Sequence, residues 1–209
     1  MTTAAALPLR ERKKAATWLA LHESAASLAL QHGVDQTTVE AIAASAVVSP
    51  RTFFNYFEVK EDAIVGLREP VLDGEQLARI SVSAGDLVGQ VSRLLVTVAG
   101  TALGGTDRTR RRRLIARYPV LGRRHMTYMV KAEGLVCQGI SGLLAGNPVW
   151  TAGAEEFSPE DAARMLVMVA GVPIRFDITS PSFDPAAGIS ADTLEPSLAL
   201  FRHLLRNIS

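Results

Sequence analysis

Residues 37–57 read Thr-Thr-Val-Glu-Ala-Ile-Ala-Ala-Ser-Ala-Val-Val-Ser-Pro-Arg-Thr-Phe-Phe-Asn-Tyr-Phe, and the punctuation of this stretch predicts two short helices. Thr37 followed three residues later by Glu40 is typical of a capping box at the start of a helix. Ser49 before Pro50 is typical of an N-cap with proline in the first helical position. A turn of four residues separates the two helices, and the second is about two turns long. The stretch therefore predicts a helix-turn-helix.

The outward face of this motif carries side chains that recognise DNA. In a helix-turn-helix the second helix lies in the major groove, where its first residues reach base edges. Arg51 can pair bidentately with guanine and Asn55 with adenine. Lys60 lies just past this helix, in a position for a phosphate, and the backbone N–H groups at the start of the first helix can hold another. Three apolar residues are expected to fix the angle between the helices: Ile42, Phe53 and Phe57. The DNA-binding candidates are Thr37, Thr38, Ser49, Arg51, Thr52, Asn55, Tyr56 and Lys60.

The rest of the chain has the pattern of an all-α protein. Apolar residues recur at spacings of three and four, and no stretch alternates apolar and polar residues as a half-buried strand does. Gly33 follows the first apolar stripe and suits a helix C-cap. Pro70 lies inside an expected helix that it can kink or break. About nine helices are expected; besides the two short ones they cover residues 9–32, 60–80, 86–102, 107–117, 119–144, 158–176 and 192–207.

Residues 9–67 carry an ordered string that is more specific than a bare helix-turn-helix pattern, which ordinary helical packing also produces. The string comprises Ala25, Ala29, Gly33, Thr37-Thr38-Val39, Ile42-Ala43, the ten residues 48–57 and Lys60-Glu61. In these positions the chain resembles the TetR family of transcriptional repressors. The resemblance implies an all-helical homodimer. It implies a DNA-binding domain over residues 1–67 and a larger ligand-binding and dimerisation domain over residues 68–209.

Two residues depart from the pattern of that family. Val47 stands in the turn where the family usually has glycine, and a β-branched residue is costly at positive φ. The turn is therefore expected either to follow another backbone path or to tolerate strain. Phe54 stands where the family often has tyrosine, so a hydroxyl that could contact phosphate is missing, and Asn55 or Tyr56 is expected to supply that contact.

The near-neutral charge of the chain hides a strongly basic block. The formal net charge is +1, from 22 Lys and Arg against 21 Asp and Glu, but residues 108–131 hold nine basic residues and no acidic one. Three hypotheses compete for this block: a solvated helix face, a contact to DNA phosphate, or a site for the anionic part of a ligand, which arginine forks suit. A weaker similarity to the acyl-CoA-like ligand-binding branch of the family lies around Arg51 to Phe57 and favours the third.

The helices beyond residue 86 supply candidates for a ligand site and for a dimer interface. An apolar cavity under a basic rim would suit an acyl-type or other hydrophobic effector, and methionine adapts well to such sites. The ligand-binding candidates are Leu95, Val98, Arg113, Met126, Met129, Val130, Met165 and Val169. The apolar stripes of the last two helices predict a four-helix bundle between two protomers. The dimer candidates are Leu166, Ala170, Leu198, Phe201 and Leu205. For both sets the alternative is ordinary packing within one chain.

Enzymatic chemistry and membrane insertion are not expected. The four histidines are scattered without metal-ligand spacing, and Cys137 is a single cysteine in an apolar helix, so no metal site or cofactor is predicted. No apolar run approaches the roughly 18 residues that span a bilayer, and no signal peptide precedes the first helix, which predicts a cytoplasmic protein.

The sequence thus predicts a dimeric transcriptional regulator, most simply a repressor that a small effector releases from a pseudo-palindromic DNA operator. One alternative is a helical lipid or acyl-ligand carrier whose helix-turn-helix has lost its function, which Val47 favours. Another is an architectural DNA binder that has no effector.

Overall fold

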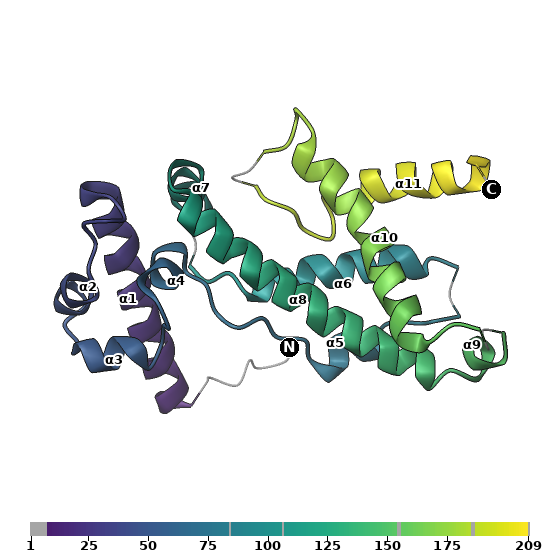
Figure 1. Ribbon diagram of the computed structural model, residues 1–209, viewed down its shortest axis with the longest axis horizontal. Coiled ribbons are helices and arrows are strands. Elements are labelled where there is room, and N and C mark those ends of the chain that lie inside the picture. The colour runs from purple at the N-terminus through teal and green to yellow at the C-terminus, as the bar shows by residue number, and fades with distance from the viewer. Residues whose placement is uncertain (1–7, 84, 106, 154–155, 185–186, 209) are drawn as a thin grey trace, which may run out of the picture. The chain divides into compact units, whose positions relative to one another are not determined.

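The computed structural model describes residues 8–83, 85–105, 107–153, 156–184 and 187–208, and these residues form helices joined by loops (Figure 1). Within the described ranges there is no strand, only an isolated antiparallel bridge between Leu67 and Leu103. The all-α prediction is confirmed, with eleven helices described rather than about nine. They are α1 (Leu9–His32), α2 (Val39–Ser45), α3 (Pro50–Phe54), α4 (Lys60–Val65), α5 (Gly74–Ala78), α6 (Leu87–Thr101), α7 (Arg108–Arg117), α8 (Pro119–Ala145), α9 (Pro148–Gly153), α10 (Pro159–Thr179) and α11 (Glu195–Ile208).

The prediction of one helix over residues 60–80 is wrong, because the chain leaves the helical path at Gly66. This residue has φ of +75°, a left-handed conformation that glycine adopts at little cost, and its N–H donates to the carbonyl of Asp62 to close α4. Pro70 lies in the irregular segment that follows. The chain turns helical again at α5, where Asp73 and Gln76 form a capping box. Between the helices expected over residues 119–144 and 158–176 the chain likewise forms a short helix, α9, that the sequence did not predict.

The chain forms two compact units, and their boundaries differ from a single cut at residue 67. The first unit comprises the residues up to Arg68 together with Leu103–Met126, and the second comprises Glu69–Ala102 and the residues from Thr127 onward. Helix α7 and the start of α8 therefore belong with the helix-turn-helix. The functions expected for the two parts of the chain stay predictions.

A buried arginine connects the two sequence segments of the first unit. Arg111 of α7 is 7% exposed, and its Nε donates to the carbonyl of Val65 at 2.7 Å, at the end of α4. Its Nη2 donates to the carbonyl of Gly104. The N–H of Gly104 donates in turn to the carbonyl of Gly66 at 2.8 Å. Because a buried guanidinium needs partners for its donors, these bonds hold residues 103–126 against α4.

The second unit has an apolar core between α6, α8 and α10. Its buried side chains include Val91 and Val98 of α6, Val136 of α8 and Val167 of α10. The hydroxyl of Ser92 donates to the carbonyl of Ala170 at 2.8 Å, so polar contacts also join α6 to α10. None of the helices described is long and apolar enough to cross a membrane.

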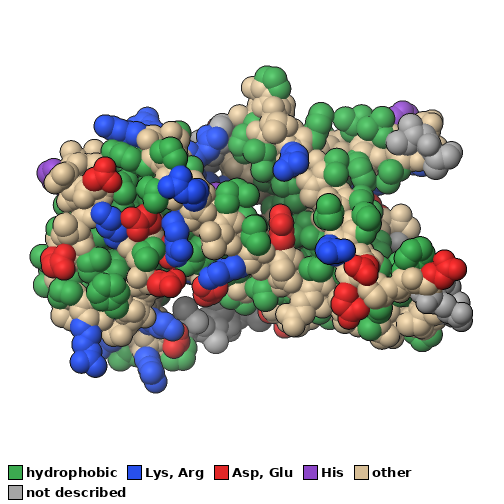
Figure 2. Space-filling view, viewed as in Figure 1, with side chains coloured by type: hydrophobic (Ala, Val, Ile, Leu, Met, Phe, Trp, Pro, Cys, Tyr) green, Lys and Arg blue, Asp and Glu red, His purple; other side chains and the backbone are tan. Residues whose placement is uncertain are grey.

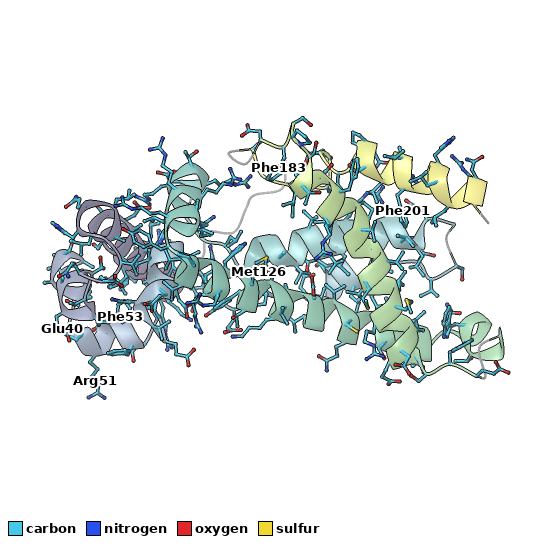
Figure 3. All side chains as sticks on the ribbon, turned by 45° about the horizontal axis from the view of Figure 1, so that its top comes forward. Glu40, Arg51, Phe53, Met126, Phe183 and Phe201 are labelled. Carbon is cyan, nitrogen blue, oxygen red and sulfur yellow. The ribbon has the colours of Figure 1, made fainter. Side chains whose placement is uncertain are left out.

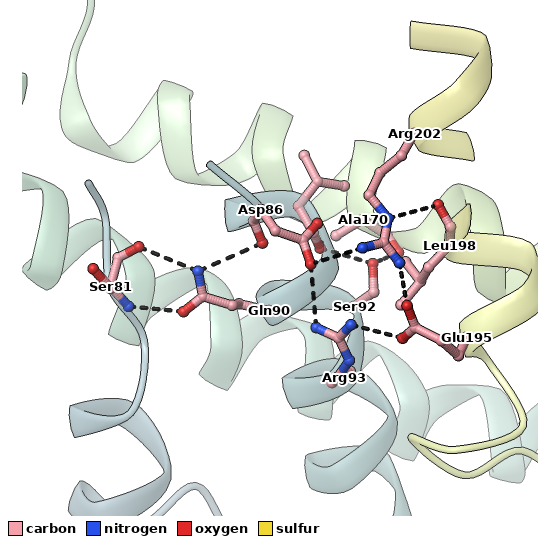
Figure 4. A network of polar contacts seen from close by, with 10 residues as sticks. Ser81, Asp86, Gln90, Ser92, Arg93, Ala170, Glu195, Leu198 and Arg202 are labelled. Atoms are coloured by element: carbon pink, nitrogen blue, oxygen red, sulfur yellow. Dashed lines mark hydrogen bonds and ion pairs between the residues drawn. The ribbon is translucent and has the colours of Figure 1, made fainter. Parts of the chain in front are cut away.

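A charged network fastens α11 to the start of α6 (Figure 4). Arg93 contacts Glu195 at 2.7 Å and Asp86 at 3.4 Å, while Arg202 contacts the same two carboxylates, with Asp86 at 3.6 Å. Hydrogen bonds from Arg93 and then Arg202 hold the pKa of Glu195 below its ordinary value. Since these side chains are partly exposed, the network positions α11 more than it adds stability.

The turn between α2 and α3 has the hydrogen bonds of a Schellman motif. The N–H of Val48 donates to the carbonyl of Ala43 at 2.9 Å, and the N–H of Val47 donates to that of Ala44 at 3.1 Å. Val47 occupies the position that is usually glycine and has φ of +57°, with a side chain that is 90% exposed. Of the two expectations for this turn, strain tolerated at positive φ is therefore the one observed.

We predict that Val47→Gly stabilises the protein. The substitution relieves a left-handed valine that costs about 1–3 kcal/mol, offset by about 0.5–1 kcal/mol of extra chain entropy in the unfolded state. Little burial is lost, because the side chain is exposed. The expected gain is about 1 kcal/mol, or about 2–4 °C in Tm followed by circular dichroism.

The matched control is Ala46→Gly, one residue earlier, where φ is −83° and glycine relieves nothing. This variant is expected to melt at a lower temperature than the wild type. Equal destabilisation by the two glycines would show that Val47 is unstrained.

Candidate nucleic-acid interface

The helix-turn-helix rests on an aromatic and aliphatic core, as expected from the sequence. Ile42 and Phe53 are fully buried and Phe57 is 3% exposed, so the prediction that these three are core residues of the motif is confirmed. Trp18 of α1 lies against the Phe57 ring at 5.4 Å between centroids, and the Phe53 and Phe57 rings are 5.7 Å apart. Helix α3 has only five residues, so this packing sets its direction.

The cap of α2 lies one residue later than predicted. The N-cap is Thr38, whose hydroxyl accepts from the N–H of Ala41, and no capping box with Glu40 forms. Thr37 is 1% exposed and its hydroxyl donates to the carbonyl of Gly33 at 2.8 Å. Its side chain therefore stabilises the α1–α2 loop, while the phosphate contact expected from the backbone N–H groups at this helix start stays a prediction.

The candidates on α3 divide into capping residues and free donors. The Ser49 hydroxyl accepts from the N–H of Thr52 at 3.1 Å and lies 2.9 Å from the Thr52 hydroxyl, so both serve the cap. Arg51 projects away from the helices while Phe53 lies among them (Figure 3). Asn55 is exposed and Tyr56 half-buried at the end of the helix. Arg51 and Asn55 are thus the exposed side chains on this helix that remain for the predicted contacts to base edges.

Lys60 has a structural partner that the sequence did not predict. Its Nζ donates to the carbonyl of Val34 at 2.9 Å, which ties the first residue of α4 to the loop before α2. An ammonium group has three donors, so this bond leaves two of them for a phosphate. The predicted phosphate contact remains compatible with this position.

A basic groove that sequence reasoning missed runs beside α3. It has a volume of about 710 Å³ and is lined by Leu9, Arg10, Lys13, Lys14, Thr17, Thr52, Asn55 and Tyr56. Figure 2 shows Lys and Arg side chains gathered at the lower left, over the region of α3 and the start of α1 in Figure 1. The available signal was the spacing of residues 10, 13, 14 and 17, which places them on one helix face.

The first unit is far more basic than the whole chain, whose net charge is +1. It contains 15 Lys and Arg against 8 Asp and Glu, whereas the second unit contains 7 against 13. Part of the basic block neutralises acids of the same unit: Arg110 contacts Glu23 at 2.7 Å, and Arg124 donates Nε to Asp62 at 2.8 Å. The net charge of +7 on this unit favours a polyanionic partner.

A buried histidine lies next to Arg111 in this unit. His22 is 3% exposed and its Nδ1–H donates to the carbonyl of Ala63 at 2.8 Å. Burial lowers the pKa of His22 below its ordinary value, partly opposed by that hydrogen bond and by Glu23. Neutral His22 therefore packs under the junction of α1, α4 and α7 as a structural group.

The ligand-binding candidates are scattered over the two units. Arg113 and Met126 belong to the first unit and the other six to the second. In the second unit, Leu95 and Val98 are buried in the core, Met129 and Val169 are half-buried, and Val130 and Met165 are exposed. None of the eight lines the groove of about 230 Å³ between the start of α6 and α11.

The dimer candidates are largely engaged within one chain. Ala170 and Leu198 are buried in the second unit, Leu166 and Phe201 are half-buried, and Leu205 is exposed. Phe201 and Leu205 line the small groove against α6. The exposed apolar side chains of α10 are instead Met165, Met168, Val172, Phe176 and Ile178.

No group of three or more His, Cys, Asp or Glu among the described residues is arranged to hold a metal ion. Comparison with curated proteins finds no match for the chain. The family model for bacterial regulatory proteins of the tetR family matches residues 21–64, which extend from the middle of α1 through α2 and α3 into α4. The matched segment therefore contains the whole helix-turn-helix, and its exposed donors lie on α3. The chain carries the N-terminal domain of the tetR family and is a DNA-binding transcriptional regulator.

Proposed function

We propose that the protein is a homodimeric repressor that a small hydrophobic effector, in the acyl-CoA class or chemically similar, releases from a pseudo-palindromic operator. The DNA-binding part of the proposal rests on one observation: α3 presents Arg51 and Asn55 to solvent above a buried aromatic core. A second candidate function, a ligand carrier with a vestigial helix-turn-helix, has no support in the turn, because Val47 adopts the backbone conformation that a functional turn needs.

The exposed face of α10 supports dimerisation. Met165, Met168, Val172 and Phe176 are 63%, 66%, 49% and 53% exposed and recur at spacings of three and four. Such a stripe on a helix whose other face packs on α6 marks a protein–protein contact. A second copy is the occupant that the proposed two-fold operator requires, because two recognition helices must then lie about 34–36 Å apart.

The effector part of the proposal rests on the division of the chain. The unit without the helix-turn-helix has its own apolar core and an acidic net charge, which gives it no electrostatic attraction to DNA phosphate. Ligand binding there would release DNA only to the extent that the ligand favours the DNA-free conformation. The effector site itself stays a prediction.

We predict that Arg51→Ala weakens operator binding by about 1–3 kcal/mol and relaxes the preference for one base pair in each half-site. The measurement is fluorescence anisotropy with an operator duplex selected by the wild type and with single-base variants of it. Arg113→Ala, an exposed arginine on α7 of the same unit, is the control and should leave base preference intact. An unchanged preference in Arg51→Ala would show that α3 does not read bases.

We predict that Met168→Glu converts a dimer into a monomer, because a carboxylate would be buried in an apolar interface. Sedimentation velocity at micromolar concentration measures the change. Val71→Glu, also on an exposed apolar position of the second unit but outside α10, should remain dimeric. A dimeric Met168→Glu protein would place the interface elsewhere.

We predict that long-chain acyl-CoA, added to the protein–operator complex, releases the DNA in a saturable manner. Free coenzyme A is the control for its phosphates, and a fatty acid is the control for its chain. Release by the fatty acid alone would identify a hydrophobic effector without a nucleotide. Unchanged DNA binding in all three titrations would exclude the acyl class.

A further inference from the structure

The first two turns of α1 carry three cations that fold stability does not explain. Arg10, Lys13 and Lys14 are exposed on α1, and no ion-pair partner of theirs occurs in the described part of the chain. By contrast, Arg110 and Arg124 of the same unit are paired with carboxylates.

These cations also oppose two local preferences of a helix. The N-terminus of a helix has a partial positive charge, which disfavours cations in its first turns. Like charges three or four residues apart, as in Arg10 with Lys13 and Lys14, repel each other across the helix surface. The N-cap position, Pro8, adds no side-chain hydrogen bond to offset this. The arrangement is unfavourable for the free protein and favourable once an anion lies against it.

The groove described above fixes where that anion lies. Arg10, Lys13 and Lys14 form one wall, and Thr52, Asn55 and Tyr56 at the end of α3 form the other. No acidic residue lines it. The Thr17 hydroxyl donates to the Lys13 carbonyl at 3.0 Å, so the cationic side chains and the polar groups of α3 remain as ligands.

We propose that Arg10, Lys13 and Lys14 bind the phosphodiester backbone of DNA beside the major groove that α3 enters. The inference rests on the proposed function and adds to it a site that carries affinity without base preference. Each phosphate that is neutralised releases counterions. Each such contact therefore steepens the plot of log K against log salt concentration by about 0.9.

The test compares the double variant Lys13→Gln/Lys14→Gln with the wild type. Glutamine keeps the helix propensity of lysine and removes the charge. The control double variant, Arg113→Gln/Arg117→Gln, removes two exposed charges from α7 of the same unit. Binding is measured from 50 to 200 mM salt, on the duplex that the wild type selects from random sequence and on a scrambled duplex. Circular dichroism confirms that each variant is folded, and Arg10→Gln serves as a milder single variant.

In the double variant, the slope of log K against log salt concentration is expected to become shallower by about 1.8 for each protomer that contacts DNA. The affinity is expected to fall by the same factor on both duplexes. The control is expected to show neither change. An unchanged slope in Lys13→Gln/Lys14→Gln overturns the proposed site, and so does an equal decrease in the control, which would indicate bulk charge. If the wild type selects no duplex, the proposed function itself fails, a result distinct from both.

Discussion

The burial of the Arg111 guanidinium is the constraint on which the first unit depends. A cation taken out of water must have its donors satisfied, and here the acceptors are carbonyls at the end of α4 and before α7. The backbone around Arg111 can pack this closely because residues 66 and 105 are glycines. Both have φ of +75°, and a Cβ on either would lie within 3 Å of the His22 ring. Burial, and then the neighbouring cations Arg108 and Arg110, lower the pKa of Arg111 below its ordinary value. The helix-turn-helix therefore cannot be separated from residues 103–126 without leaving polar groups unpaired.

This constraint changes the meaning of the basic block. Along the sequence it is one run of charge, but on α7 and α8 its members face different ways. Arg111 is buried, Arg110 and Arg124 pair with acids of the first unit, and Arg113 is exposed. None of the three hypotheses for the block applies to all of it. Eight of its nine charges nonetheless belong to the DNA-binding unit, which is why a chain of net charge +1 can attract a polyanion.

The sequence predicted what depends on local pattern. Helix α1 begins and ends at the expected residues, and the buried positions Ile42, Phe53 and Phe57 follow from helical spacing. The break at Gly66 was missed because a glycine within a helical pattern does not reveal its backbone conformation. The dimer face that we propose on α10 differs from the one expected from the sequence for another reason. Helix α10 is apolar on two sides, and only the packing of Ala163, Val167 and Ala170 on α6 shows which side is covered. The basic groove needed the fold, because its walls lie about forty residues apart in sequence.

Recognition of DNA by this unit depends on a helix too short to form alone. Helix α3 has five residues, so its geometry comes from its neighbours: the cap from Ser49, the buried Phe53, and the turn at Val47. The hydrogen bond from the Lys60 ammonium to the Val34 carbonyl ties the start of α4 to the loop before α2. The turn keeps both Schellman hydrogen bonds despite a strained valine, which shows that the surrounding packing, and not the preference of that residue, determines the backbone there. A rigid platform of this kind is what the proposed division of roles requires, in which Arg51 and Asn55 carry base specificity and phosphate contacts carry affinity.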